Sequence, residues 1–201
     1  RRWTLVAWLF LSLGLILGGR WAYDVLGWGG YWGWDPVENA SLMPGLAGTA
    51  FLHSVMIQEK RDMFKTWNMF LVILTYSLVI LGTFVVRSGV ISSVHAFSQS
   101  DVGKWFFTFI IGMFIFSAYW VTKRRPELAS KNQIKSFLSR EAAFLYNNFL
   151  IIIILIIVFF YTYLPIITEL FFGEQMFVGP PVYERTLAPF FALLLLLMGV
   201  A

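Results

Sequence analysis

Residues 144–167 read FLYNNFLIIIILIIVFFYTYLPII, an isoleucine-rich stretch of 24 residues without a charged side chain. An α-helix that crosses the hydrocarbon core of a bilayer needs about 20 predominantly apolar residues. This stretch therefore predicts a membrane-spanning helix, and it sets the class of fold expected for the rest of the chain.

Five further apolar stretches have a similar length, although the last is ended by the end of the sequence. Together the six predicted spans are Trp3–Ala22, Ser41–Gln58, Trp67–Val86, Trp105–Val121, Phe144–Ile167 and Leu187–Ala201. The second span contains small and polar residues, which suit a helix packed among other helices. We expect an all-α, polytopic membrane helix bundle that forms one domain over residues 1–201.

The composition agrees with this class of fold. Hydrophobic residues make up 59% of the 201 residues and charged residues only 13%, with a mean hydropathy of +0.74. Because soluble domains carry about 25% charged residues, a free-standing soluble globule is excluded, and so is a disordered chain. The absence of cysteine excludes a disulfide framework, a thiolate metal site and a thiol nucleophile. The sequence begins without Met and stops inside an apolar run, so we interpret it as an interior fragment of a longer protein.

The basic residues indicate a topology. Eleven of the fifteen Lys and Arg residues fall at the N-terminus and in the loops 59–65 and 123–143, whereas seven of the eleven acidic residues fall on the other side. Since cytoplasmic loops are enriched in Lys and Arg, we expect the loop 123–143 in the cytoplasm and the loops 23–40, 87–104 and 168–186 outside. The basic residues form short clusters between apolar runs, which is not the pattern of a nucleic-acid-binding protein.

The segment 21–44 contains the densest aromatic feature. Trp21, Tyr23, Trp28, Tyr31, Trp32 and Trp34 lie among Gly27, Gly29, Gly30 and Gly33. An aromatic belt at the membrane interface is one interpretation. A site for a large planar ligand is another, because glycines let the backbone approach a flat molecule while rings form its walls. The composition leaves both interpretations open.

The residues that follow predict the start of a helix. Asp35 is a good N-cap, Pro36 suits the first helical position, and Glu38 at the third position completes a capping box. Capping is the simpler role for both acids, and it would fix the aromatic loop at the outer end of the second span. Pro44 predicts a kink or a restart of that span.

The two histidines are both candidate ligand residues. His53 lies inside the second span, about 18 Å from Ser41 along a helix, where an ionisable side chain indicates either a functional site or a hydrogen bond between helices. Neutral imidazole is also an axial ligand of haem iron. His95 lies in the outward loop 87–104, where a lone histidine is usually solvated. It shares a membrane side with the Trp-rich loop, and Arg87 would pair with a carboxylate such as a propionate.

The run from Trp28 to Ser41, WGGYWGWDPVENAS, resembles the WWD motif of haem-handling membrane proteins. Its continuation from Asp35 resembles more narrowly the CcmF family, the haem lyase component of the bacterial system I pathway of cytochrome c maturation. Residues 52–61, 82–97 and 139–148 also resemble this family, so the resemblance extends over essentially the whole chain. The sequence departs from the usual motif at Tyr31, usually Trp, and at Gly33, usually a larger residue.

The resemblance implies two haem sites in a multi-pass protein of the bacterial inner membrane. Trp28, Trp32, Trp34 and Asp35 match the motif that holds haem on the periplasmic face, and His95 matches an external ligand of its iron. His53 matches a membrane-embedded ligand of a separate b-type haem, proposed to reduce the incoming haem. In this family the second ligand of each haem lies outside the residues present here.

The resemblance also implies a reaction and its partners. A haem chaperone would deliver haem, which would be joined by thioether bonds to the Cys-x-x-Cys-His segment of apocytochrome c, with other maturation subunits in the same bilayer. We expect this chain to position the reactants and to supply no general acid or base. A haem carrier or exporter without ligation activity is one alternative, and a non-haem polytopic transporter subunit is another. The transporter leaves the joint placement of both histidines unexplained.

Overall fold

The computed structural model describes residues 1–26, 30–88, 102–130, 132 and 139–200, and this part of the chain forms six α-helices. They are α1 (Arg2–Val25), α2 (Pro36–Arg61), α3 (Lys65–Ser88), α4 (Val102–Lys123), α5 (Arg140–Phe172) and α6 (Pro180–Val200). Each of these six helices is long and apolar enough to cross a membrane. The predicted all-α polytopic helix bundle is therefore confirmed.

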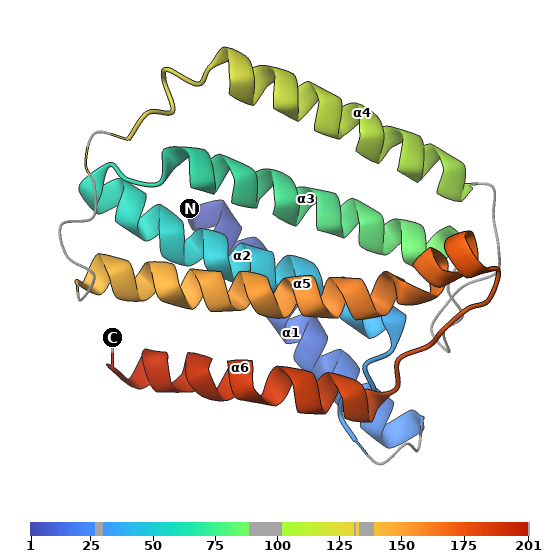
Figure 1. The fold of residues 1–201 in the computed structure, drawn as a ribbon. Coiled ribbons are helices and arrows are strands. Elements are labelled where there is room, and N and C mark those ends of the chain that lie inside the picture. Colours follow the sequence, from blue (N-terminus) through green and yellow to red (C-terminus); the bar gives the residue numbers. More distant parts are fainter. Residues whose placement is uncertain (27–29, 89–101, 131, 133–138, 201) are drawn as a thin grey trace.

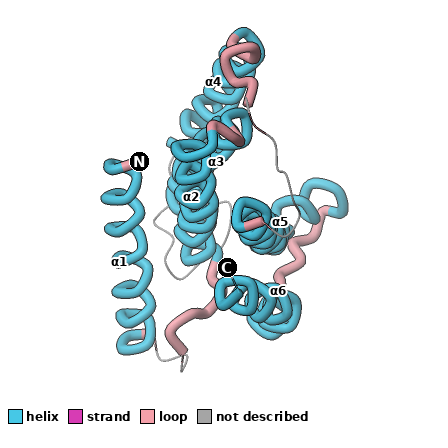
Figure 2. Tube along the Cα trace, turned by 90° about the vertical axis from the view of Figure 1, so that its left-hand side faces the viewer, coloured by secondary structure: helices cyan, strands magenta, loops and turns pink. Residues whose placement is uncertain are grey.

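Helix α2 is the centre of the bundle. It packs against α1, α3 and α5, whereas α4 packs on α3 and α6 packs on α5. Figure 1 shows α4, α3, α2, α5 and α6 in this order across the molecule. Figure 2 shows α1 on one side of α2 and α3, with α5 and α6 on the other. The span that the sequence marked by small and polar residues is thus the helix with neighbours on several sides.

The main core lies where α2, α3, α5 and α6 meet. Met43, Val85, Ile154, Val158 and Leu187 are each at most 1% exposed there. Within a bilayer such packing is driven by van der Waals contact and polar bonds, because lipid tails are as apolar as the side chains. This core joins the first half of α2 to the first half of α6.

Pro44 lies inside a continuous α2, so the helix does not restart there as one expectation allowed. Proline has no backbone N–H, and the carbonyl of Ala40, four residues earlier, consequently loses its helical donor. Gly82 of α3 lies against this carbonyl, so that a Cβ atom at position 82 would be 3.1 Å from the Ala40 oxygen. The glycine thereby allows α3 to approach α2 closely.

The last helix begins earlier than the sequence predicts. Helix α6 starts at Pro180 rather than at Leu187, and it includes Glu184 and Arg185, which the prediction assigned to an external loop. Proline is favourable in the first turn of a helix, because its fixed φ is helical and the first N–H groups have no helical acceptor. The proline pair therefore begins the helix.

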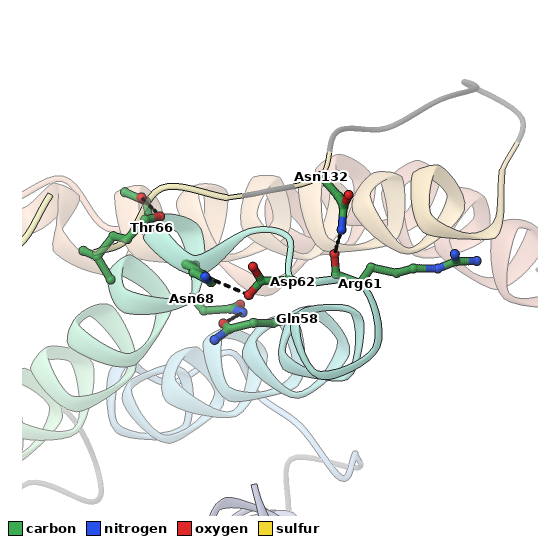
Figure 3. A network of polar contacts seen from close by, with 8 residues as sticks. Gln58, Arg61, Asp62, Thr66, Asn68 and Asn132 are labelled. Carbon is green, nitrogen blue, oxygen red and sulfur yellow. Dashed lines mark hydrogen bonds and ion pairs between the residues drawn. The ribbon is translucent and has the colours of Figure 1, made fainter. Parts of the chain in front are cut away.

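The turn between α2 and α3 is held by polar contacts at the basic end of the bundle (Figure 3). Asp62 adopts a left-handed conformation with φ 54°, and its carboxylate pairs with Lys65 at 2.7 Å. The buried side chain of Asn68 donates to Gln58, and Asn132 donates to the carbonyl of Arg61 at 2.7 Å. These contacts fix the end of the central helix that lies opposite the Trp-rich loop.

Candidate functional site

The predicted capping box is present at the start of α2. The Asp35 carboxylate accepts the N–H of Val37 at 3.0 Å, and Glu38 accepts the N–H of Asp35 at 3.3 Å. Glu38 also accepts the N–H of Gly33 at 2.9 Å. Both acids therefore serve the cap, and Glu38 additionally shapes the loop that precedes it.

The first part of the described loop packs on α1. The Tyr31 ring stacks on Tyr23, with centroids 4.6 Å apart and planes 12° from parallel. A Cβ atom at Gly19 would lie 2.7 Å from the carbonyl oxygen of Tyr31. Glycine at position 19 is thus required for the loop backbone to pass this close to α1.

The last part of the loop is fixed to α5 and α6. Trp34 has φ 55°, an unfavourable region for a bulky residue, and its ring stacks on Tyr183 of α6 with centroids 4.9 Å apart. The amide of Asn39 lies 2.9 Å from the Trp34 carbonyl oxygen, and it also contacts Thr162 and Tyr183. Such backbone strain costs about 1–3 kcal/mol and persists only where surrounding contacts hold it.

A groove lies between these two attachments, bounded by α1, the loop and the start of α2. Its volume is about 410 Å³, and its walls are Phe10, Leu11, Gly14, Leu15, Gly18, Gly19, Trp21, Trp32, Val37, Glu38 and Ser41. We call it the α1–α2 groove. A volume of this size falls within the range of about 300–1,000 Å³ usual for ligand pockets.

Trp32 is one of three aromatic residues in the wall of the α1–α2 groove, together with Phe10 and Trp21. Its ring meets the edge of Trp34 with centroids 6.3 Å apart. The indole nitrogen is buried and has no hydrogen-bond partner among the residues described. A buried donor without a partner costs free energy.

A second groove of about 390 Å³ shares Leu11, Val37 and Ser41 with the first and continues toward α3. Arg87 is one of its lining residues and is exposed. The two grooves together form a largely apolar surface, and Glu38 and Arg87 are its charged lining residues. This arrangement suits a flat apolar molecule that carries a carboxylate.

His53 belongs to a separate cavity at the other end of the α1–α2 contact. This cavity of about 220 Å³ is lined by Arg1, Leu5, Trp8, Thr49, Leu52, His53 and Met56. The His53 ring meets the edge of Phe144 of α5 with centroids 5.8 Å apart. Its Nδ1 atom is buried without a hydrogen-bond partner within 3.5 Å among the described residues, although Asn148 is nearby.

The structure therefore brings some predicted site residues together and separates others. Trp32, Trp34 and Asp35 lie beside the α1–α2 groove, and Arg87 lines its extension. His53 lies 18 residues along α2 from Asp35, which is about 27 Å along a helix. Trp28 and His95, two of the predicted haem contacts, fall outside the described residues.

Several residues beside the groove were not predicted. Gly14 and Gly18 of α1 have no neighbour within 4 Å of the position that a Cβ atom would take, so they border open space. Their spacing of four residues is a small-residue pattern typical of close helix contacts, and this signal could have been read from the sequence. No pattern in the sequence marked Asn39 or Tyr183 as part of the site. They are 144 residues apart and meet only in the folded chain.

Comparison with known proteins agrees with this architecture. Residues 1–91 match the family model described as cytochrome C assembly protein. The solved structure of a cytochrome c heme lyase, CcmF, has a TM-score of 0.77 and 36% sequence identity to this chain, covering 100% of it and 29% of that protein. These matches place the chain among polytopic membrane proteins of the cytochrome c assembly family.

The sequences of individual relatives narrow the family. CycK of Bradyrhizobium diazoefficiens is 50% identical over 98% of this chain and 30% of its own length. CcmF of Pseudomonas aeruginosa is 44% identical over 100% of this chain and 30% of its own length, and CcmF of Escherichia coli is 40% identical over 100% and 31%. The chain belongs to the CcmF-type cytochrome c biogenesis proteins and spans about 30% of the length of these relatives.

Proposed function

We propose that this chain provides the external haem site of a cytochrome c haem lyase. The observation that carries the proposal is the α1–α2 groove, which Trp32 lines, together with its extension, which Arg87 lines. Haem is flat and apolar and carries two propionates, so the shape and the polar groups of this surface fit it. Trp28 and His95 are proposed to complete the site from segments outside the described residues.

The residues of the chain would act by binding and orientation. The α1 glycines at positions 14, 18 and 19 and the Trp32 ring would contact the faces of the substrate haem. Arg87 would pair with a propionate, and a ring nitrogen of His95 would bind the iron. Asp35 and Glu38 would hold the loop in place from the helix cap. Thiols of an apocytochrome Cys-x-x-Cys-His segment would then add across the two vinyl double bonds, with sulfur joining one carbon and hydrogen the other.

His53 is proposed as a ligand of a second, resident haem of the b type. The His53 side chain lines a largely apolar cavity, and imidazole is an axial ligand of haem iron. The cavity of about 220 Å³ is smaller than a usual ligand pocket, so the rest of the full-length protein would have to supply the remaining walls. When bound, this haem would supply the electron that keeps the substrate iron reduced.

The distribution of the basic residues suggests which side of the membrane each end of the bundle faces. Because eleven of the fifteen basic residues fall in the sequence at the N-terminus and in the segments 59–65 and 123–143, we propose that the end of the bundle with the α2–α3 turn faces the cytoplasm and that the Trp-rich loop faces the periplasm. The inner membrane, a haem chaperone, apocytochrome c and other maturation subunits are the proposed surroundings. A haem carrier without ligation activity would need the external site but no second haem at His53. No observation in the structure favours this alternative.

The proposal is tested by visible spectra of the full-length protein in mild detergent after addition of haemin and dithionite. We expect His53→Ala to remove one set of reduced bands and His95→Ala to remove the other. We expect Trp32→Leu to weaken external haem binding roughly tenfold, because an aromatic contact is worth about 0.5–1.5 kcal/mol beyond its buried area.

The matched control for Trp32 is Trp67→Leu. Trp67 is also half-buried and also has a buried indole nitrogen without a partner among the described residues, but it lies on α3 and outside the groove. Its substitution should leave both haem spectra unchanged. If Trp32→Leu and Trp67→Leu had equal effects, or if wild-type protein took up no haem, the proposed site would be refuted.

A further inference from the structure

The three tryptophans of the motif do not have equivalent places in the structure. Trp28 lies outside the described residues, and Trp32 is a wall of the α1–α2 groove. Trp34, in contrast, is not part of that wall, and one face of its ring is covered by Tyr183. Because this face of the Trp34 ring is covered, Trp34 is poorly placed to bind a ligand directly.

Trp34 connects the groove to a buried polar cluster. Its edge meets the Trp32 ring on one side, and its carbonyl lies 2.9 Å from the Asn39 amide on the other. Asn39 is 0% exposed and lies 3.1 Å from Thr162 of α5 and 3.3 Å from the Tyr183 hydroxyl of α6. One buried amide thus joins the loop to two helices on the far side of α2.

The cluster continues beyond Tyr183. The ring of Tyr161 meets Tyr183 edge-on with centroids 5.2 Å apart, and its hydroxyl lies 3.2 Å from that of Thr186. These contacts restrict the rotamer of Tyr183, and the stacked Trp34 ring is restricted in turn. With φ 55° at Trp34, the loop depends on such contacts to keep its shape.

We propose that Asn39 and Tyr183 are positioning residues that act through Trp34 to orient Trp32 at the groove. The inference rests on the proposed function, because haem is its ligand. It adds to the proposed site two residues that do not contact the haem themselves. Asn39 fixes the backbone of Trp34, Tyr183 fixes its ring, and the ring edge sets the plane of Trp32. The stack needs the Tyr183 ring, whereas its hydroxyl is one of three acceptors around the Asn39 amide.

The test uses four variants of the full-length protein. Asn39→Ala removes the amide, Tyr183→Leu removes the stacked ring, and Tyr183→Phe keeps the ring without the hydroxyl. The control is Asn68→Ala, which removes a buried asparagine of α3 that donates to Gln58 near the other end of α2 (Figure 3). Two quantities are measured in each: hydrogen exchange of residues 30–38, and the dissociation constant of external haem per folded protein.

We expect Asn39→Ala and Tyr183→Leu to accelerate exchange in residues 30–38 at least tenfold and to raise the haem dissociation constant about tenfold. Tyr183→Phe should stay within about threefold of wild type in both. Asn68→Ala should lower the melting temperature but leave loop exchange and haem affinity unchanged. A role in general stability alone would instead predict equal effects of Asn39→Ala and Asn68→Ala.

Three results would overturn the inference. Unchanged loop exchange in Asn39→Ala would show that the amide does not hold the loop. Faster exchange with wild-type haem affinity would show that loop order has no effect on the ligand. If the wild-type protein bound no external haem, the proposed function and this positioning role would both be refuted. That outcome is distinguished from failure of the positioning role alone because Trp32→Leu would then also have no effect on haem binding.

Discussion

Asp35 and Glu38 show how two side chains define both a helix and the loop before it. Their carboxylates accept backbone N–H groups of Val37, Asp35 and Gly33, which would otherwise have no acceptor at the start of α2. The cap therefore fixes the direction in which the chain enters the helix. Because Trp32 and Trp34 lie immediately before it, the cap also limits where these rings can lie.

Replacing Glu38 by alanine tests this role. The change removes an acceptor from two backbone N–H groups, so we expect the free energy of unfolding to fall by about 1–2 kcal/mol. The measurement is thermal unfolding of the full-length protein in detergent, followed by circular dichroism. Glu38→Gln, which keeps an acceptor oxygen, should recover most of the loss.

Glu127→Ala is the matched control for Glu38. Glu127 is an exposed glutamate that pairs with Arg124 at 3.1 Å, and exposed pairs of this kind contribute about 0–1 kcal/mol. Its removal should leave the melting temperature nearly unchanged. Equal shifts in Glu38→Ala and Glu127→Ala would contradict the capping role.

Single residues were predictable where their partners are near in sequence. The cap at Asp35 follows from four consecutive residues, and the structure confirms it. The contact of Asn39 with Tyr183 joins residues 144 positions apart, and no local pattern distinguishes this asparagine from any other. The wall of the groove could be suspected from its glycines and rings, whereas the residues that orient the rings could not.

Among the helices, the contact of α2 with α3 depends on a proline and a glycine on facing surfaces. Pro44 leaves the Ala40 carbonyl without its helical donor, and Gly82 packs directly on that oxygen. Close approach of a glycine to a backbone carbonyl of a neighbouring helix recurs at helix–helix interfaces. The proline is therefore accommodated by the neighbouring helix.

Gly82→Ala should weaken this contact. The new Cβ atom would lie 3.1 Å from the Ala40 oxygen and 3.4 Å from the Ala40 Cβ atom, and neither the carbonyl nor the Cβ can rotate away. We expect a loss of about 1–3 kcal/mol in the free energy of unfolding, as in other overpacked cores. Thermal unfolding of the full-length protein measures it.

Gly112 of α4 provides the comparison for Gly82. A Cβ atom there would have no neighbour within 4 Å, so Gly112→Ala meets no obstruction. Alanine is the better helix former by about 0.5–1 kcal/mol, so this substitution should leave stability unchanged or raise it slightly. If both alanine variants were equally stable, α2 and α3 would not need the close approach.

Helix boundaries were less predictable than helix existence. The apolar runs located all six spans, because their length alone identifies a membrane helix. The start of α6 was misplaced, since Pro180, Glu184 and Arg185 are typical of a loop when only hydropathy is considered. Proline is also a first-turn residue, and the structure uses it in that way.

In the whole molecule, α1 stands apart from the main core. It packs on α2, and the α1–α2 groove and the His53 cavity lie along that contact, whereas the second groove lies mainly between α2 and α3. The groove at the Trp-rich loop and the cavity at His53 are therefore at opposite ends of one helix pair. This places the two proposed haem sites toward opposite faces of a membrane-spanning bundle.

The topology can be tested with cysteines, because none of the 201 residues is a cysteine. Glu174→Cys would place a thiol at the end of the bundle with the Trp-rich loop, and Ser130→Cys would place one at the basic end; both positions are exposed. A membrane-impermeant maleimide is added to intact cells that express the full-length protein, in which any cysteine elsewhere is replaced. We expect labelling of Glu174→Cys in intact cells and of Ser130→Cys only after the membrane is permeabilised.

The physical reason is the cost of moving positive charge across the membrane during insertion. Eleven of the fifteen basic residues fall in the sequence at the N-terminus and in the segments 59–65 and 123–143, and such residues near the ends of spans favour a cytoplasmic location. Six spans place both termini of this segment on that same side, so one orientation determines all of the loops. Labelling of Ser130→Cys in intact cells would reverse the orientation. The Trp-rich loop would then face the cytoplasm, where an external haem site could not receive a periplasmic apocytochrome.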